Sequence, residues 1–207
     1  MKGLPSTLAV AVALCMSLII FGSCGDNETG PEKDALTRNS PQNLLKIYAK
    51  ALEDKSLADY EACLEDDYRF VFLQQDYTAA GVDPMAPYWG RTLDLDATSA
   101  MFTNSHVFGI TCDLPILTDI APSDTLRHLV TGIGLKVTVD RGEPELTTFW
   151  VKQTFLHFTL AMDRYQPSLW VIRGIEEEVE DLLETPGWQV PFKEEQTYGN
   201  LKSMFRK

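Results

Sequence analysis

Three histidines are the side chains of this chain best suited to proton transfer near neutral pH, and they lie far apart in the sequence. His106 enters a predicted strand with its inward-facing residues, and His157 lies within a long apolar segment. Either could be the base of a pocket, although a hydrogen-bonded core histidine is the more frequent case. His128 begins a strand and is expected to be exposed.

A carboxylate on the inward face of a strand would be another route to acid–base chemistry, because burial moves its pKa towards the working pH. Alternation along the strand points Asp113 outward, away from the face shared by positions 106, 108, 110, 112 and 114. In the last strand Trp170 and Ile172 share a face, and Glu176–Glu178 lie beyond its end. We therefore expect no buried strand acid, unless a β-bulge reverses the alternation.

No motif for a metal, a phosphate or a dinucleotide is present in the sequence. The histidines are not spaced as a metal-binding pair with each other or with two cysteines. A Gly-x-Ser-x-Gly elbow, a phosphate loop and a dinucleotide fingerprint are all missing. Gly132-Ile133-Gly134 lies inside a strand pattern and indicates a bend or bulge. We expect neither a metal site nor a cofactor.

The N-terminal segment, residues 1–23, is predicted to be a signal peptide. The uncharged run Leu8–Phe21 has about 14 residues, fewer than the roughly 20 that cross a bilayer as a helix. Phe21-Gly22-Ser23-Cys24 resembles the lipobox of bacterial lipoproteins, with Phe21 in place of the usual Leu. The resemblance implies a lipid on Cys24 and a location in the bacterial cell envelope, facing the periplasm or the exterior. An ordinary signal peptide or an uncleaved anchor is the alternative.

The other cysteines are expected to be structural. Cys15 leaves with the signal peptide, and Cys63 and Cys112 fall on a helix and a strand. Export permits a disulfide between them, but two separate buried thiols are the preferred interpretation.

The elements that must position these residues begin after a flexible tether, residues 24–39, which has almost nothing to bury. Ser40-Pro41 has the N-cap and first-turn residues of a helix, and the break at 54–56 separates it from a second, shorter helix. A strand with Tyr68, Phe70 and Phe72 on one face follows, and then a long loop over 74–90. A third helix from about Thr92 is expected to bury four residues: Leu93, Ala97, Ala100 and Met101.

Residues 105–176 are predicted to form a four-stranded antiparallel meander, with turns at 121–124, 140–144 and 163–167. The third strand, 146–161, is apolar on both predicted faces, so one of them needs a cover. Residues 176–184 are expected to form a short acidic helix. The tail, 186–207, should pack on the domain or on a partner. The second strand turns five residues inward: Leu129, Ile133, Leu135, Val137 and Val139.

This order of elements resembles the NTF2-like, or SnoaL-like, family over about residues 40–180. Supporting motifs are Ser40–Leu45, Tyr88-Trp89-Gly90-Arg91 and Leu169–Ile172. The resemblance implies one α+β domain, residues 40–185, in which a strongly curved antiparallel sheet wraps the helices around a cone-shaped pocket. That family includes isomerases, dehydratases, cyclases and members without known catalysis, so the fold does not define the function. The pocket candidates are His106, His157, Tyr68, Trp89 and Trp170.

Composition and net charge limit the classes of molecule that this protein is expected to bind. The chain is 44% hydrophobic and 23% charged, as in globular proteins, and its net charge is −12. That charge argues against nucleic acid and against attachment to anionic lipid by charge alone.

The leading functional hypothesis is a lipid-anchored envelope protein that acts without catalysis. It would hold a small apolar ligand in the cone or present its sheet to a protein partner, which includes a second copy of itself. The alternative is an isomerase- or dehydratase-like enzyme that uses a histidine or a nearby tyrosine. A pocket filled by Phe70, Phe72 and Trp170 would favour the interaction module, and a buried acid beside a pocket histidine would favour the enzyme.

Overall fold

The computed structural model describes residues 36–151, 154–179 and 193–206. Contacts divide the chain into Met1–Ala35 and Leu36–Lys207, and the described residues all belong to the second unit. The predicted signal peptide, Cys24, most of the predicted tether and residues 180–192 therefore lie outside the described part. Within that part, no helix is both long and apolar enough to cross a bilayer.

The two N-terminal helices begin where the sequence predicted, but the second ends at Ala62, before Leu64, which was expected to belong to it. Helix α2 (Pro41–Glu53) has Ser40 as its N-cap, whose hydroxyl accepts a hydrogen bond from the Asn43 amide at 3.2 Å. Helix α3 (Leu57–Ala62) has Ser56 as its N-cap. The buried stripe of α2 has the predicted helical spacing, with Leu44, Tyr48 and Leu52 fully buried.

Strand β1 (Leu64–Val71) starts earlier than predicted, but Tyr68, Phe70 and Phe72 are buried together as expected. The loop predicted over 74–90 is wrong in part, because it contains three short elements, one of which pairs with β1. Strand β2 pairs antiparallel with β1, and the Phe72 amide donates to the Pro87 carbonyl at 2.9 Å. The three elements are η1 (Gln74–Asp76), α4 (Tyr77–Ala80) and β2 (Tyr88–Gly90).

Helix α5 (Arg91–Thr103) is rotated relative to the prediction. Ala97 and Met101 are buried, but Leu93 is 41% exposed and Ala100 is half-buried. The stripe that faces the interior places a carboxylate among apolar residues, and it consists of Asp94, Ala97, Thr98, Met101 and Phe102.

The predicted four-stranded meander is confirmed, and its first three strands are each bent into two parts. They are β3 (Val107–Thr111) with β4 (Ile116–Ser123), β5 (Leu126–Gly132) with β6 (Leu135–Val139), and β7 (Thr147–Val151) with β8 (Thr154–Met162). The fourth strand is β9 (Trp170–Val179). The β5–β6 bend lies at Gly132–Gly134, as predicted, and backbone hydrogen bonds between Gly134 and Asp113 continue the ladder across it.

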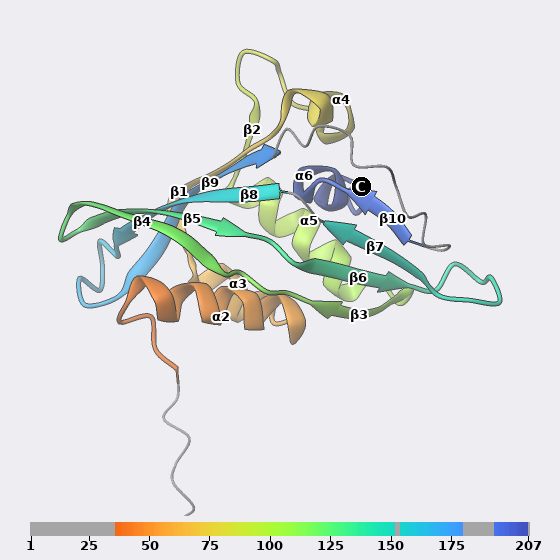
Figure 1. Cartoon of the computed structure of the whole chain (residues 1–207), viewed down its shortest axis with the longest axis horizontal. Helices are drawn as coiled ribbons and strands as arrows, with labels where there is room; N and C mark the ends of the chain where they lie inside the picture. Colours follow the sequence, from red (N-terminus) through yellow and green to blue (C-terminus); the bar gives the residue numbers. More distant parts are fainter. Residues whose placement is uncertain (1–35, 152–153, 180–192, 207) are drawn as a thin grey trace, which may run out of the picture. The chain divides into compact units, whose positions relative to one another are not determined.

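The bends divide the sheet into two parts, with strand orders β2-β1-β9-β8-β5-β4 and β10-β7-β6-β3. The meander pairs are antiparallel, whereas β1 with β9 and β10 (Lys193–Gln196) with β7 are parallel. Figure 1 shows β10 beside β7, with helix α6 (Tyr198–Ser203) next to them. The curvature lets inward side chains of both parts share one core.

The inward-facing residues differ from the predicted ones in the first and third strands of the meander. A register shift between Val107 and Gly109 leaves Phe108 75% exposed and His106 exposed, against the inward placement expected for both. In the third strand the inward residues are Phe149 and Val151, and then the even positions 156, 158 and 160. Trp150 and Phe155 lie half-buried on the other face, so the expectation of two apolar faces holds only in part. All five second-strand residues are buried as predicted.

A third difference lies in β9. Thr159 pairs with Gly174 and Leu160 with Ile172, so Arg173 is an extra, bulged residue. Beyond it Ile175 and Glu177 face inward. Residues 176–179 continue the strand, which corrects both the predicted strand end and the acidic helix expected to start at Glu176.

Cys63 and Cys112 are free and buried, as predicted. Burial raises the pKa of each thiol to about 12, so both behave as small hydrophobic groups.

Candidate functional site

The five pocket candidates separate into two groups. Tyr68, Trp89 and Trp170 are buried, whereas His106 is exposed and His157 is half-buried on the outward face of β8. The Trp89 indole donates to the Ala80 carbonyl at 3.1 Å, so its polar atom is used within the fold. All three histidines belong to the described residues, and none of them is buried.

The interior holds a polar cluster that the sequence analysis did not find. Asp94 of α5 is fully buried, and its carboxylate accepts a hydrogen bond from the Tyr60 hydroxyl at 2.7 Å and from the Tyr68 hydroxyl at 3.5 Å. The helical spacing of Asp94 from Ala97 and Met101 was a usable signal. We call Tyr48, Tyr60, Tyr68, Asp94, Tyr198 and Lys202 the interior cluster.

A layer of tyrosines connects the first helices to the last one. The Tyr48 and Tyr198 hydroxyls are 2.7 Å apart, and those of Tyr48 and Tyr60 are 3.4 Å apart. Burial raises the pKa of all four tyrosines well above the usual value, so they stay protonated. Each hydroxyl can therefore donate one hydrogen bond, and the two that point to Asp94 supply donors to its carboxylate.

Lys202 brings a cation into this layer from the C-terminal helix. Its ammonium donates to the Tyr60 hydroxyl at 2.8 Å and forms an ion pair with Asp94. Burial lowers the pKa of Lys202, and the Asp94 carboxylate opposes that shift. The four-residue spacing from Tyr198 to Lys202 places both side chains on one face of α6, which therefore fills the interior with a ring and a counter-ion.

The Glu177 carboxylate binds the first backbone amides of α6. The bulge at Arg173 turns its carboxylate inward, where it accepts hydrogen bonds from the Tyr198 amide at 2.6 Å and the Gly199 amide at 2.8 Å. Nearby, the Thr197 hydroxyl donates to Asp76 at 2.7 Å. Burial raises the pKa of Glu177 to about 7, and the two amide donors only partly oppose this.

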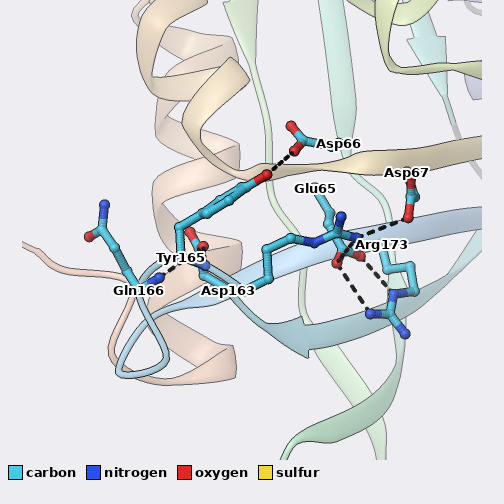
Figure 2. A network of polar contacts seen from close by, with 8 residues as sticks. Glu65, Asp66, Asp67, Asp163, Tyr165, Gln166 and Arg173 are labelled. Atoms are coloured by element: carbon cyan, nitrogen blue, oxygen red, sulfur yellow. Dashed lines mark hydrogen bonds and ion pairs between the residues drawn. The ribbon is translucent and has the colours of Figure 1, made fainter.

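A second buried acid lies near the start of β1 and is paired with two arginines. Buried Glu65 accepts two hydrogen bonds from Arg173, at 2.6 and 3.2 Å, and lies 3.4 Å from Arg164. Figure 2 shows that the turn after β8 approaches this group, where the Tyr165 hydroxyl donates to Asp66 at 3.3 Å. Arg164 also donates to Asp67 at 2.9 Å. These contacts fasten the β8–β9 turn to β1.

The outward face of β1, β9, β8, β5 and β4 carries an open hollow of ≈770 Å³. His157 lies on this face, and its Nε2 is 2.5 Å from a Glu178 carboxylate oxygen. His128 Nδ1 is 3.2 Å from the Thr159 hydroxyl, and its half-buried position differs from the exposure expected. The apolar lining comes from Val71, Ile120 and Val130, and the charged lining from Asp67, Arg69, Arg173 and Glu176.

Among residues 36–151, 154–179 and 193–206, no group of three His, Cys, Asp or Glu side chains is arranged to hold a metal ion. The buried acids Glu65, Asp76, Asp94 and Glu177 have arginine, lysine, hydroxyl or amide partners instead.

Comparisons with known proteins address the fold only. No family model and no curated protein matches the sequence. A proposed aromatic ring hydroxylase from Novosphingobium aromaticivorans is 13% identical, with 71% of this chain and 90% of that chain covered and a TM-score of 0.50. An NTF2-like protein of unknown function in nutrient uptake from Rhodospirillum rubrum is 16% identical, with 68% and 98% covered and a TM-score of 0.47. A proposed scytalone dehydratase from N. aromaticivorans is 13% identical, with 73% and 87% covered and a TM-score of 0.48.

Identities this low bear on the fold and not on activity. The helix order, the long bent strands and the mixed α+β architecture agree with the arrangement that the sequence motifs implied. By its fold, the described part of the unit Leu36–Lys207 is a mixed α+β domain with a curved, mainly antiparallel sheet, similar to the ring hydroxylase structure at a TM-score of 0.50.

Proposed function

We propose that this protein is a non-catalytic interaction module of the bacterial cell envelope, which binds a protein partner through the outward face of its sheet. The filled interior carries the proposal. Phe70, Phe72 and Trp170 are buried in the core, and α6 adds the buried side chains of Tyr198 and Lys202. A domain that uses its own chain to fill the cone leaves its outer surface for recognition.

The outward hollow has the composition of a recognition surface. Its lining combines three apolar side chains with charged residues of both signs, and protein interfaces likewise combine apolar contacts with polar and charged ones. Strand β4 forms the edge of this sheet, and its Ile116, Leu117 and Ile120 are all exposed. An edge strand with exposed apolar residues is open to pairing with another chain, so a partner that covers it would remove an unfavourable surface.

The anchor is the second part of the proposal. Lipidation at Cys24 would hold the domain at a membrane, and the polar segment from Gly25 would act as the tether up to Arg38, whose carbonyl accepts a hydrogen bond from the Trp170 amide at 2.7 Å. The low content of apolar residues between Gly25 and Asn39 supports this role.

The histidine-based enzyme receives less support from the geometry. The partners of the buried acid Asp94 are Tyr60, Tyr68 and Lys202, and its charge is balanced by the lysine. His157 lies on the outward face of the sheet, away from Asp94, and its partner is the exposed carboxylate of Glu178.

Photo-crosslinking in cells tests the proposal. A photoreactive residue at Val130, inside the hollow, should give a discrete protein adduct, identifiable by mass spectrometry as a partner or a second copy. The same residue at Met85, which is 91% exposed in the loop before β2, serves as the control. Absence of a discrete adduct from position 130, or equal adducts from both positions, would refute the proposed surface. Native mass spectrometry of the same protein would reveal any small molecule bound instead.

A further inference from the structure

The Lys202 ammonium lies in a cage of aromatic rings closed by a carboxylate, which we call the ammonium cage: Tyr60, Phe70, Asp94 and Tyr198. Its nitrogen is 5.0 Å from the ring centroid of Phe70, 5.1 Å from that of Tyr198 and 5.4 Å from that of Tyr60. These distances are within the range of cation–π attraction, and proteins use such cages to hold alkylammonium ligands. The Lys202 and Asp94 side chains are 1% and 0% exposed, so water does not weaken the attraction.

Most of the cage is assembled without the helix that fills it. Tyr60, Phe70 and Asp94 come from α3, β1 and α5, and Tyr68 of β1 gives Asp94 a further hydrogen bond. The ammonium belongs to Lys202, which lies 108 residues after Asp94 in the sequence. A buried carboxylate is strongly unfavourable without a cation, so these residues require a positive group whichever molecule carries it.

The closing segment is one of the smaller structural units of the domain. Helix α6 has six residues, and the four residues of β10 pair with β7 at the edge of the sheet. Short segments at the edge of a sheet open at a lower free energy than a core strand does. Closure also buries Glu177, whose pKa lies at about 7, with Asp76 and Lys202 as its charged neighbours. Ionisation of Glu177 near neutral pH therefore works against the closed position.

We propose that the ammonium cage is a binding site for small linear alkylammonium ions, which α6 occupies in cis through Lys202, so that an external amine and the C-terminal segment compete for it. A primary ammonium fits best because it donates to both Tyr60 and Asp94, as Lys202 does. The chain behind it must be unbranched and apolar, because it replaces the buried methylene groups of a lysine.

The first test is rescue of the full-length Lys202→Ala variant by n-butylammonium chloride. We expect a saturable rise of the melting temperature by several degrees, because the added cation again balances Asp94. The rise should vanish in Lys202→Ala/Asp94→Asn. The matched control is Lys50→Ala, which removes an exposed lysine paired with Asp54, and it should not respond. An equal response to 1-butanol would mean simple cavity filling and would overturn the proposal.

The second test uses the unmodified chain, so it does not depend on the folding of a variant. Hydrogen exchange of the α6 amides, 198–203, should become at least about twofold faster in n-butylammonium than in equimolar sodium chloride, while the β8 amides are unchanged. If α6 exchanges at the same rate in both salts, Lys202 is a permanent structural cation and the proposed competition is wrong, even where the alanine variant is rescued.

Discussion

Glu177 should make this domain less stable as the pH rises from mildly acidic to neutral. Its pKa is about 7 in the folded protein, against 4.5 for an ordinary glutamate, because the carboxyl group is buried under α6. Below pH 4.5 both the folded and the unfolded chain hold this proton. Between pH 4.5 and 7 the unfolded chain releases it while the folded chain keeps it, so the free energy of unfolding falls with increasing pH. At 1.36 kcal/mol for each pH unit, the full loss is about 3 kcal/mol.

Urea unfolding of the wild type and Glu177→Gln between pH 4.5 and 8.5 would measure this effect. Glutamine has nearly the same shape but no titrating proton, so carboxylates elsewhere contribute equally to both proteins and cancel. We expect the stability difference between the two proteins to change by about 3 kcal/mol in favour of the variant as the pH rises, roughly 6–12 °C in melting temperature. A difference that stays constant across this range would refute the burial argument for Glu177.

Four further outcomes are expected. Lys202→Met should destabilise the domain by about 3–5 kcal/mol in urea unfolding, because it leaves the Asp94 charge buried and unpaired, and adding Asp94→Asn should recover much of the loss if the reasoning holds. Truncation after Glu184 should lower the melting temperature by at least several degrees, because Tyr198, Leu201 and Lys202 are buried; an unchanged value would contradict that packing. Cys24→Ala should abolish fatty-acid labelling and release the protein from membranes, whereas unchanged labelling would exclude this anchor. Cys63 and Cys112 should react with a thiol reagent at pH 8 only after unfolding, since their pKa values are about 12, and non-reducing peptide mapping that finds them cross-linked would contradict the free thiols.

The candidate site illustrates how small local irregularities decide which groups meet. Simple alternation predicted no inward acid on the last strand, and it holds as far as Ile172. One bulged residue, Arg173, then reverses it and turns Glu177 towards the start of α6. A similar shift near Val107 moves His106 to the surface. Bulges depend on how two strands pair, so the composition of one strand does not reveal them.

Local signals in the sequence determined the elements themselves. Ser40 and Ser56 define helix starts because their side chains cap free amides, and the turn residues between the apolar runs define the meander. Charge and the absence of motifs narrowed the classes of partner, and the first 24 residues carry the prediction of a lipid anchor.

Only the tertiary structure decided which residues meet in the interior of the domain. Asp94 and Lys202 lie 108 positions apart, and nothing local to either residue specifies the other. They meet because the curved sheet and the parallel pairing of β10 with β7 bring α6 against α5 and α3, where a buried carboxylate requires a cation. The physical reason is that caps and turns are short-range interactions along the chain, whereas burial and charge pairing depend on distances that exist only after folding.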